Sequence, residues 1–573
     1  MNRERSTLLI IIAVIVVLAC IVVPLVGVGG YLLLIRTRSA TSTAAIALQS
    51  PAPAATSLSQ PGPSATAVSK RPKGGELRLP GSMPPTLDPA QSTDSTSAGY
   101  IVEIFSGLVT LDPDLQLVPD IAQSYEISQD GRTYRFHLRQ NVRFHNGRAV
   151  KASDVSYSLE RSCSPSTGSP VAATYLGDIV GARDMLAGRA DHLAGVKVVD
   201  DYTVDVQIDA PRASFLAKLS HPVAYVVDRN SIGSSDPVKA ANGTGPFKLT
   251  EFKENDHITL QANTNYYREP KPALDRVVFQ LAAGDPVTMY ENDELDIAPV
   301  GTGALPRVQD PQSGLSEQLS ITEQMATFYI GLNCQLPPFN DVKVRQAFAQ
   351  ALDRQRIVDN LYDKTVPAAT TIVPPTMPGY SISGLHAPAY DVAAAKQSLS
   401  QSSYGSADKL PPITLHVSSA SPQTDPTAAA IAALLKENLG IDITIEQSDW
   451  PTFLGELNKP KNPFQMYVLG WIADYPDPEN FLNLLFHTGS ADNHSRYSNP
   501  EVDKLLDQAG LEMDAQKRAG LYEQAERLIL ADAPVIPLYH DVEYWLTKPY
   551  VKGMHYPAMV VPRFQYVYIE KGG

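Results

Sequence analysis

The segment at residues 470–481 (Gly-Trp-Ile-Ala-Asp-Tyr-Pro-Asp-Pro-Glu-Asn-Phe) brings an indole, several carboxylates and two prolines into a short stretch. Trp471 and Asp474 are three residues apart, so an aromatic ring and a negative charge lie close together in the chain. The apolar run at residues 466–471 predicts a short buried strand, and the prolines that follow predict a turn. Asp474 is therefore expected at the carboxyl end of a strand, where open α/β sheets bind ligands. A carboxylate shielded by aromatic walls attracts an ammonium group far better than one in bulk water.

The same residues are also typical of a surface turn. In that interpretation the Asp474 carboxylate accepts hydrogen bonds from its own backbone, as aspartates in turns commonly do. Trp471 is then an ordinary core residue. The two interpretations differ in where they place the carboxylate, which is either in a cleft or on the open surface.

The length and charge of the chain limit the classes of protein to consider. A chain of 573 residues exceeds what one hydrophobic core usually organises, so two or more lobes are expected. The formal net charge of -14 argues against nucleic acid as a partner. Cys163 and Cys334 are the cysteines outside the apolar N-terminal leader, and they form either one disulfide or two buried free thiols.

The N-terminus is expected to tether the protein to a membrane. Residues 8–35 are almost uninterruptedly apolar, which at about 1.5 Å per residue is long enough to cross a hydrocarbon core of roughly 30 Å. The sequence Val-Leu-Ala-Cys that ends at Cys20 resembles the lipidation signal of bacterial lipoproteins, in which the cysteine is acylated and the leader removed. The residues after Cys20 stay apolar, which favours an uncleaved transmembrane signal anchor and cytoplasmic stub at residues 1–35. Either alternative holds the folded part outside the cytoplasm.

A linker and then a folded region follow this leader. Residues 36–74 are rich in Pro, Ser, Thr and Ala with almost no bulky side chains, so they cannot offset the entropy of ordering and are expected to be disordered. The folded part begins near Gly75. Asp130-Gly131 predicts a hairpin turn, because alternating strand patterns lie on both sides of it. Residues 99–109 are expected to be helical.

The second half of the chain carries the pattern of a βαβ unit. Residues 413–417 and 441–445 read as strands, and residues 426–439 between them predict a helix that Gly440 ends. A lobe of this type needs a partner to make a cleft. The strand-rich half before residue 330 is expected to be that partner.

Taken in order, these segments resemble the family-5 extracellular solute-binding proteins, the oligopeptide- and dipeptide-binding components of bacterial ABC importers. The resemblance covers essentially residues 75–562. Further matching segments are Gly-Thr-Gly-Pro-Phe-Lys-Leu at 243–249, Asn-Tyr-Tyr at 265–267, residues 342–354, residues 470–482 and residues 533–539.

The resemblance implies an α/β, two-lobe, three-domain fold of the periplasmic-binding-protein type (type II, peptide-binding cluster), preceded here by the N-terminal transmembrane helix. It places the first lobe at residues 75–330, with an inserted subdomain at about 113–225, and completes it with residues 536–573. The second lobe is expected at residues 331–535. In the peptide binders of this family, an aspartate in the context Gly-Trp-x-x-Asp pairs with the ligand's α-ammonium group.

The ligand-binding residues that the resemblance implies are therefore Asp474 as the anchor, Trp471 as a wall of the same pocket, Tyr175 from a segment that reaches the ligand, and Gly470 and Ala473 beside the anchor. The implied function is the capture of peptides between two closing lobes and their delivery to an ABC transporter permease with its ATPase subunits. We expect a monomer on the extracytoplasmic face of a bacterial membrane, held there by its anchor.

Catalysis and cofactors are not expected. The chain has no Gly-x-Ser-x-Gly elbow, no His-Glu-x-x-His and no phosphate-binding Gly-x-x-x-x-Gly-Lys, so no enzyme, catalytic residue, metal or cofactor is predicted. Two alternatives stay open. The same fold could bind an oligosaccharide or a nickel or haem chelate, or the protein could have a sensory or structural role at the cell surface.

Overall fold

A computed structural model of the chain describes residues 71–281, 284–419 and 423–570. The predicted membrane anchor at residues 1–35, Cys20 and nearly all of the predicted linker lie outside these ranges. Among the described helices, none is both long enough and apolar enough to span a bilayer.

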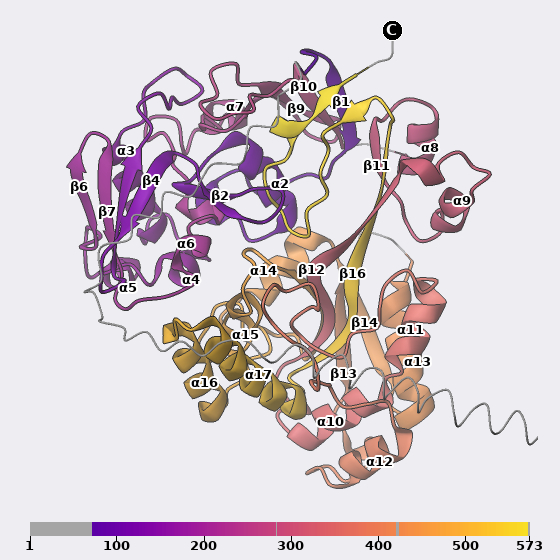
Figure 1. The fold of residues 1–573 in the computed structure, drawn as a ribbon. Helices are drawn as coiled ribbons and strands as arrows, with labels where there is room; N and C mark the ends of the chain where they lie inside the picture. The colour runs from indigo at the N-terminus through magenta and orange to yellow at the C-terminus, as the bar shows by residue number, and fades with distance from the viewer. Residues whose placement is uncertain (1–70, 282–283, 420–422, 571–573) are drawn as a thin grey trace, which may run out of the picture. The chain divides into compact units, whose positions relative to one another are not determined.

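Two four-stranded sheets form the part of the fold that we call the upper lobe, after its place in Figure 1. The first sheet has the order β1 (Glu76–Pro80), β10 (Arg276–Gln280), β9 (His257–Ala262) and β8 (Phe247–Lys253), with β1 parallel to β10 and the other pairs antiparallel. Leu77 and Leu79 of β1 are buried, as alternation along a half-buried strand requires. They pack in one core with Ile101 and Ile104 of α2 (Ser95–Ile104).

The second sheet of the upper lobe is entirely antiparallel. Its order is β4 (Ala122–Ile127), β5 (Thr133–Leu138), β7 (Thr203–Gln207) and β6 (Val196–Asp200). Around it lie α3 (Ala152–Cys163), α4 (Ala172–Leu176), α5 (Ala182–Leu186), α6 (Phe215–Lys218) and the ribbon of β2 (Val109–Leu111) and β3 (Leu117–Pro119). Gly131 turns the β4–β5 hairpin with a φ of 67°, a conformation that glycine adopts without steric cost.

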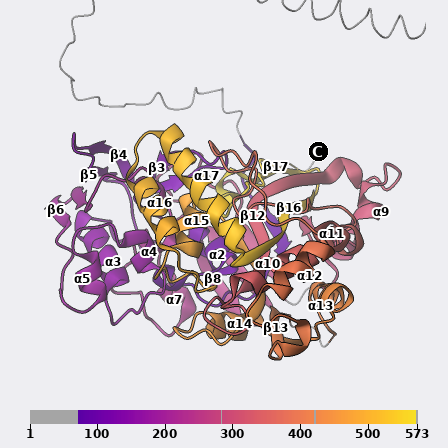
Figure 2. The same ribbon diagram turned by 90° about the horizontal axis from the view of Figure 1, so that it is seen from below.

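A six-stranded mixed sheet organises the part that we call the lower lobe. Its order is β11 (Ile297–Pro299), β16 (Val535–Thr547), β12 (Leu319–Leu332), β15 (Met466–Ile472), β13 (Ile413–Ser418) and β14 (Ile443–Ser448). Helices α10 (Val342–Ala351), α11 (Arg354–Leu361), α12 (Val392–Ser400) and α13 (Pro426–Leu439) lie on one side of it, and α14 (Trp450–Leu457), α15 (Glu479–Phe486), α16 (Pro500–Leu511) and α17 (Ala515–Asp532) complete the lobe. Figure 2 shows α15–α17 and α10–α13 on opposite sides of β12 and β16.

Strand β12 shows why the sheet is covered on both faces. Its Ile330 and Leu332 belong to the core formed with α10–α13, whereas Tyr329 belongs to the core formed with α15–α17. Successive side chains of a strand point to opposite faces, so each face of this central strand is buried under its own helical layer.

The long strands β12 and β16 run from the lower lobe to the upper lobe side by side (Figure 1). Their antiparallel pairing breaks between Glu323 and Thr327 and then resumes. At the break, the Met325 N–H donates to Ala558 O at 2.9 Å and the Ala473 N–H donates to Met325 O at 2.8 Å. The ladder between the lobes is therefore interrupted beside the segment that carries Asp474.

The remaining elements are short. They are α7 (Pro237–Ala240), α8 (Pro286–Glu291), α9 (Leu305–Gln309), β17 (Val551–Lys552), β18 (Tyr568–Ile569) and 3-10 turns at Pro89–Gln91, Pro222–Ala224, Ser316–Gln318, Ala407–Lys409 and Phe564–Tyr566.

Several predictions from local sequence patterns are confirmed. The helix at residues 426–439 is α13, which ends at Gly440 in the left-handed conformation, and β13 and β14 on either side of it pair in parallel. The helix expected at residues 99–109 is wrong in its limits. It ends at Ile104, because residues 109–111 form β2 and pair with β3. Cys163 and Cys334 are free thiols, as in the second of the two alternatives, but only Cys163 is buried, whereas Cys334 is partly exposed.

Candidate ligand-binding site

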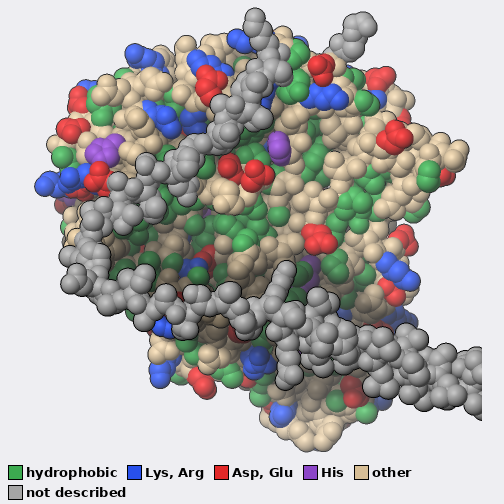
Figure 3. Space-filling model, viewed as in Figure 1, with side chains coloured by type: hydrophobic (Ala, Val, Ile, Leu, Met, Phe, Trp, Pro, Cys, Tyr) green, Lys and Arg blue, Asp and Glu red, His purple; other side chains and the backbone are tan. Residues whose placement is uncertain are grey.

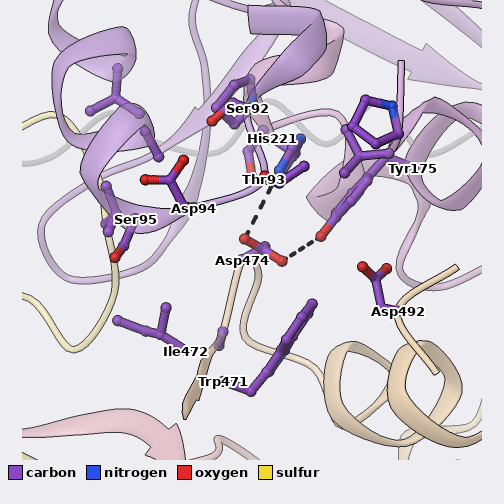
Figure 4. A pocket seen from close by; sticks show the side chains of 18 of the residues that line it. Ser92, Thr93, Asp94, Ser95, Tyr175, His221, Trp471, Ile472, Asp474 and Asp492 are labelled. Carbon is purple, nitrogen blue, oxygen red and sulfur yellow. Dashed lines mark hydrogen bonds and ion pairs between the residues drawn. The ribbon is translucent and has the colours of Figure 1, made fainter. Parts of the chain in front are cut away.

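A cavity of about 320 Å³ lies between the two lobes. Both lobes and a C-terminal segment form its wall (Figure 4). Its wall includes Asp94, Tyr175 and His221 of the upper lobe, Gly470, Trp471, Ile472, Ala473, Asp474, Asp492 and His494 of the lower lobe, and Val560 and Val561. On the face shown in Figure 3, hydrophobic side chains gather in the middle of the molecule.

The end of β15 positions the anchor segment. β15 ends at Ile472, so Asp474 follows the carboxyl end of a buried strand, as the sequence predicts. Gly470 lies opposite Phe328 of β12, and a Cβ at residue 470 would come within 2.7 Å of the Phe328 ring. Gly470 is thus required for close packing of the strand that delivers Asp474.

Asp474 is held by hydrogen bonds from both lobes. The Tyr175 hydroxyl of the upper lobe donates to Asp474 Oδ2, and the Asn480 Nδ2 donates to the same oxygen at 3.3 Å. Asn480 Oδ1 in turn accepts from the Asp474 N–H at 3.1 Å and from Trp471 Nε1 at 3.0 Å. The buried Asn480 therefore fixes the indole and the carboxylate relative to each other.

In the turn that follows, the side chain that accepts a backbone hydrogen bond is that of Asp477 and not that of Asp474. Asp477 Oδ1 accepts the Glu479 N–H at 3.0 Å. The interpretation of Asp474 as a self-capped surface residue is therefore wrong. Its carboxylate points toward Tyr175 and His221 across the space between the lobes (Figure 4).

His221 faces Asp474 as a neutral imidazole. Its Nδ1 accepts the Val223 N–H at 3.2 Å, so the ring proton is on Nε2, which lies 4.0 Å from Asp474 Oδ1. Burial lowers the pKa of His221 to about 4 and outweighs the attraction of Asp474. The ring stacks on Tyr175 with centroids 3.8 Å apart. Both upper-lobe partners of Asp474 are thus uncharged at neutral pH.

The cavity as a whole is acidic. Asp94 and Asp492 add two carboxylates to that of Asp474, and among the described residues no Lys or Arg lines the wall. Burial, followed by the nearby charge of Asp474, raises the pKa of Asp492 to about 7. Burial lowers the pKa of His494 to about 3, so this histidine brings no positive charge either. As far as the structure describes the chain, the wall therefore offers negative charge without a counter-cation of the protein.

The structure brings the five predicted site residues together. Asp474, Trp471, Tyr175, Gly470 and Ala473 all line the same cavity, although Tyr175 comes from a distant part of the chain. Ala473 contributes mainly through its backbone bond to β12. Asn480, His221, Asp94 and Asp492 were missed by sequence reasoning. Only Asn480 had a signal, because it lies inside the segment at residues 470–481.

The fold and this cavity define a solute-binding protein, and comparison with known families agrees. Residues 116–493 match the family "Bacterial extracellular solute-binding proteins, family 5 Middle", and the chain belongs to this family.

Individual relatives match over most of their length. The "Probable deoxycholate-binding periplasmic protein YgiS" of Escherichia coli (strain K12) is 33% identical and covers 83% of this chain and 90% of its own. The "Oligopeptide-binding protein OppA" of Bacillus subtilis (strain 168) is 29% identical, covering 85% and 91%.

Solved structures also indicate how the lobes are arranged. The Escherichia coli murein tripeptide binding protein MppA superimposes with a TM-score of 0.78 at 27% identity, covering 87% of this chain and 99% of its own. The unliganded open form of MppA gives a TM-score of 0.64 at the same identity, covering 88% of this chain and 98% of its own. The present structure is therefore more similar to the first of these two MppA structures than to the unliganded open form.

Proposed function

We propose that this protein captures peptides between its two lobes and delivers them to an ABC transporter permease with its ATPase subunits. The observation that carries this proposal is Asp474, a carboxylate in an acidic cavity between the lobes whose hydrogen-bond partners are all neutral. Such a group lacks a cation, and the α-ammonium of a peptide supplies one. Relatives named for oligopeptide, dipeptide and murein tripeptide binding support the same class of ligand.

The geometry suggests how binding is coupled to closure. Tyr175 and His221 come from the upper lobe and Asp474 from the lower lobe, so an ammonium group on Asp474 is enclosed only when the lobes meet. Charge-assisted hydrogen bonds in a water-poor site are short and strong. A ligand that bridges the lobes shifts the equilibrium between open and closed forms, and the permease then recognises the closed form.

A second candidate ligand is an amphipathic steroid acid, as the name of the YgiS relative suggests. Apolar wall residues such as Leu469, Val560 and Val561 suit a steroid body. The three wall carboxylates disfavour its acid group, because like charges repel strongly in a partly dry cavity. Charge therefore favours a cationic ligand over this one.

Proteins of this fold can also bind solutes other than peptides, such as an oligosaccharide or a metal chelate. An oligosaccharide needs no charge, and a metal chelate brings its own ligands. Within the described ranges, no three His, Cys, Asp or Glu side chains are placed to hold a metal ion. A sensory or structural role at the cell surface would require no transport partner.

We also propose that the protein acts as an anchored, non-catalytic monomer outside the cytoplasm. The uncleaved anchor at residues 1–35, the linker at 36–74 and the lobes at 75–330 with 536–573 and at 331–535 belong to this proposal. Intact-mass measurement of the native protein distinguishes an uncleaved chain from one cleaved and acylated at Cys20.

Titration calorimetry on the full-length chain tests the ligand class. A tripeptide with a free amino terminus is expected to bind, whereas its N-acetylated form and deoxycholate bind weakly. Asp474→Asn should weaken binding of the free tripeptide roughly 30-fold or more, since the loss of one partner of such a pair costs about 2 kcal/mol or more.

A charge-matched control separates the site from general electrostatics. Asp191 is exposed and lies in the upper lobe outside the cavity wall, so Asp191→Asn should leave affinity unchanged. Tight deoxycholate binding together with no tripeptide binding would overturn the peptide proposal. Equal affinities of the wild type and Asp474→Asn would remove Asp474 from the site.

A further inference from the structure

Asp492 is the cavity carboxylate that has no partner within the described part of the chain. It lies in the loop between α15 and α16 and is half-buried in the cavity wall. Among the described residues, its carboxylate accepts no hydrogen bond and makes no ion pair, whereas Asp474 accepts two hydrogen bonds. Leaving a shielded carboxylate without a donor is costly, so such a group calls for a partner from outside the chain.

Asp492 lies on the same side of the site as Tyr175. The charges of Asp474 and Asp492 both act on the Tyr175 hydroxyl and help to raise its pKa. In Figure 4 the Tyr175 hydroxyl lies between the two carboxylates, and the Trp471 ring lies below them. Both carboxylates line the same cavity and the charge of Asp474 acts on Asp492, so one ligand in this cavity faces both.

His494 adds an unused acceptor to the same wall. It is 4% exposed, and its Nε2 lies 2.8 Å from the Asn458 Oδ1. A carboxamide oxygen only accepts, so Nε2 carries the ring proton and Nδ1 is left as a bare acceptor. This Nδ1 is buried and has no hydrogen-bond partner in residues 71–281, 284–419 and 423–570. Two acceptors that lack donors thus lie two residues apart in the chain.

We propose that Asp492 forms a second cation subsite, so that the preferred ligands are peptides with a basic side chain close to the amino terminus. This inference rests on the proposed function, because it assumes that the α-ammonium occupies Asp474. A lysine ammonium or arginine guanidinium carries several N–H donors and a full charge, which match an ionised carboxylate with a neutral imidazole nearby.

A cycle of two ligands and two proteins tests the subsite by calorimetry on the full-length chain. The ligands are Lys-Ala-Ala and norleucine-Ala-Ala, which have nearly the same shape and differ by the side-chain ammonium. The proteins are the wild type and Asp492→Asn, which removes the charge and keeps the shape. The wild type is expected to bind the lysine peptide about tenfold or more tightly than the norleucine peptide, and Asp492→Asn should abolish most of this preference.

The outcomes separate this inference from the proposed function. If the norleucine peptide binds and lysine gives no advantage, or if Asp492→Asn keeps the full advantage, the subsite is overturned and peptide capture stands. If neither peptide binds the wild type, both proposals fail. The exposed Asp191→Asn variant is the charge-matched control and should keep the preference for lysine.

A diamine distinguishes a peptide from a polyamine as the ligand that supplies the two cations. 1,5-Diaminopentane carries two ammonium groups without a peptide backbone. Weaker binding of the diamine than of Lys-Ala-Ala supports a peptide ligand. Tighter binding of the diamine would overturn the peptide part of the inference and assign both carboxylates to a polyamine.

Discussion

The carboxylates on the two sides of the short segment around Asp474 differ in the charge of their partners. Asp474 faces the cavity with neutral partners, whereas Asp477 and Glu479 face away from it and each meets a cation of the protein. Arg518 Nη2 lies 2.8 Å from Asp477 Oδ2, and Lys218 Nζ lies 2.6 Å from Glu479 Oε1. In this segment, a carboxylate with a cation of the protein beside it is structural, and the carboxylate that faces the cavity without one is the candidate binding group.

The paired side also joins the lobes. Lys218 belongs to α6 of the upper lobe and Glu479 to α15 of the lower lobe, and Lys218 also lies 3.0 Å from Asp178 Oδ2. Tyr475, from the lower lobe, is fully buried in a core of the upper lobe. The lobes therefore meet through a filled, ion-paired contact on one side of the segment and an acidic cavity on the other.

The largest effect is expected from removing Lys218, one of the two cations named on the filled side. Lys218→Met should lower the free energy of unfolding by about 3–5 kcal/mol, because it leaves Glu479 buried without its charge partner. Chemical denaturation of the full-length chain measures this change. The double variant Lys218→Met with Glu479→Gln should recover part of the loss. No recovery would show that the methionine side chain, and not the uncompensated charge, causes the loss.

A smaller effect on stability is expected at Asp477. Asp477→Asn should lower the free energy of unfolding by about 1–3 kcal/mol, since it removes the partner of Arg518 and weakens the acceptor of the Glu479 N–H. Peptide affinity should stay within about twofold of the wild type. Asp474→Asn should show the reverse pattern. If both variants lose affinity and stability alike, the distinction between the two sides is wrong.

The acidic cavity should also respond to pH. The pKa of Asp492 is raised to about 7 in the free protein, and a bound cation lowers it by favouring the ionised form. The affinity for Lys-Ala-Ala should therefore fall by about fivefold to tenfold as pH decreases from 7.5 to 6. Asp492→Asn should remove most of this dependence in calorimetric titrations.

Three neutral groups around Asp492 keep their state in this window. Tyr175 stays neutral, because burial and nearby carboxylates raise the pKa of the phenol further. His221 and His494 stay neutral, with pKa values lowered to about 4 and about 3. A pH dependence that survives Asp492→Asn would exclude Asp492 as its cause.

The smallest effect is expected at the hydrogen bond that crosses the cavity. Tyr175→Phe removes the hydroxyl that donates to Asp474 Oδ2 and keeps the ring that stacks on His221. Peptide affinity should change by less than about fivefold, because the ligand ammonium compensates for the lost donor. A loss as large as that of Asp474→Asn would show that Tyr175 itself contacts the ligand.

The local elements were predictable, and the contacts between distant segments were not. Helix α13 and strand β15 follow from apolar periodicity and from the glycine or prolines at their ends. Asp474 could be placed because it follows a strand directly. Lys218 and Glu479 each look like surface charges in the sequence, and only the meeting of α6 with α15 pairs them. Asp492 carries no local signal, because an aspartate in a polar loop is usually solvated.

The interrupted ladder between β12 and β16 bears on how the lobes open to admit a ligand. Twisting or sliding of two paired strands would break many main-chain hydrogen bonds at once. Bending at a break in the register disturbs only a few of these hydrogen bonds. The break lies beside Ala473, so a bend at this point would lie close to the anchoring carboxylate. Asp474 would then sit near the pivot, where little displacement occurs, while the far rim of the cavity opens widest and admits the rest of the molecule.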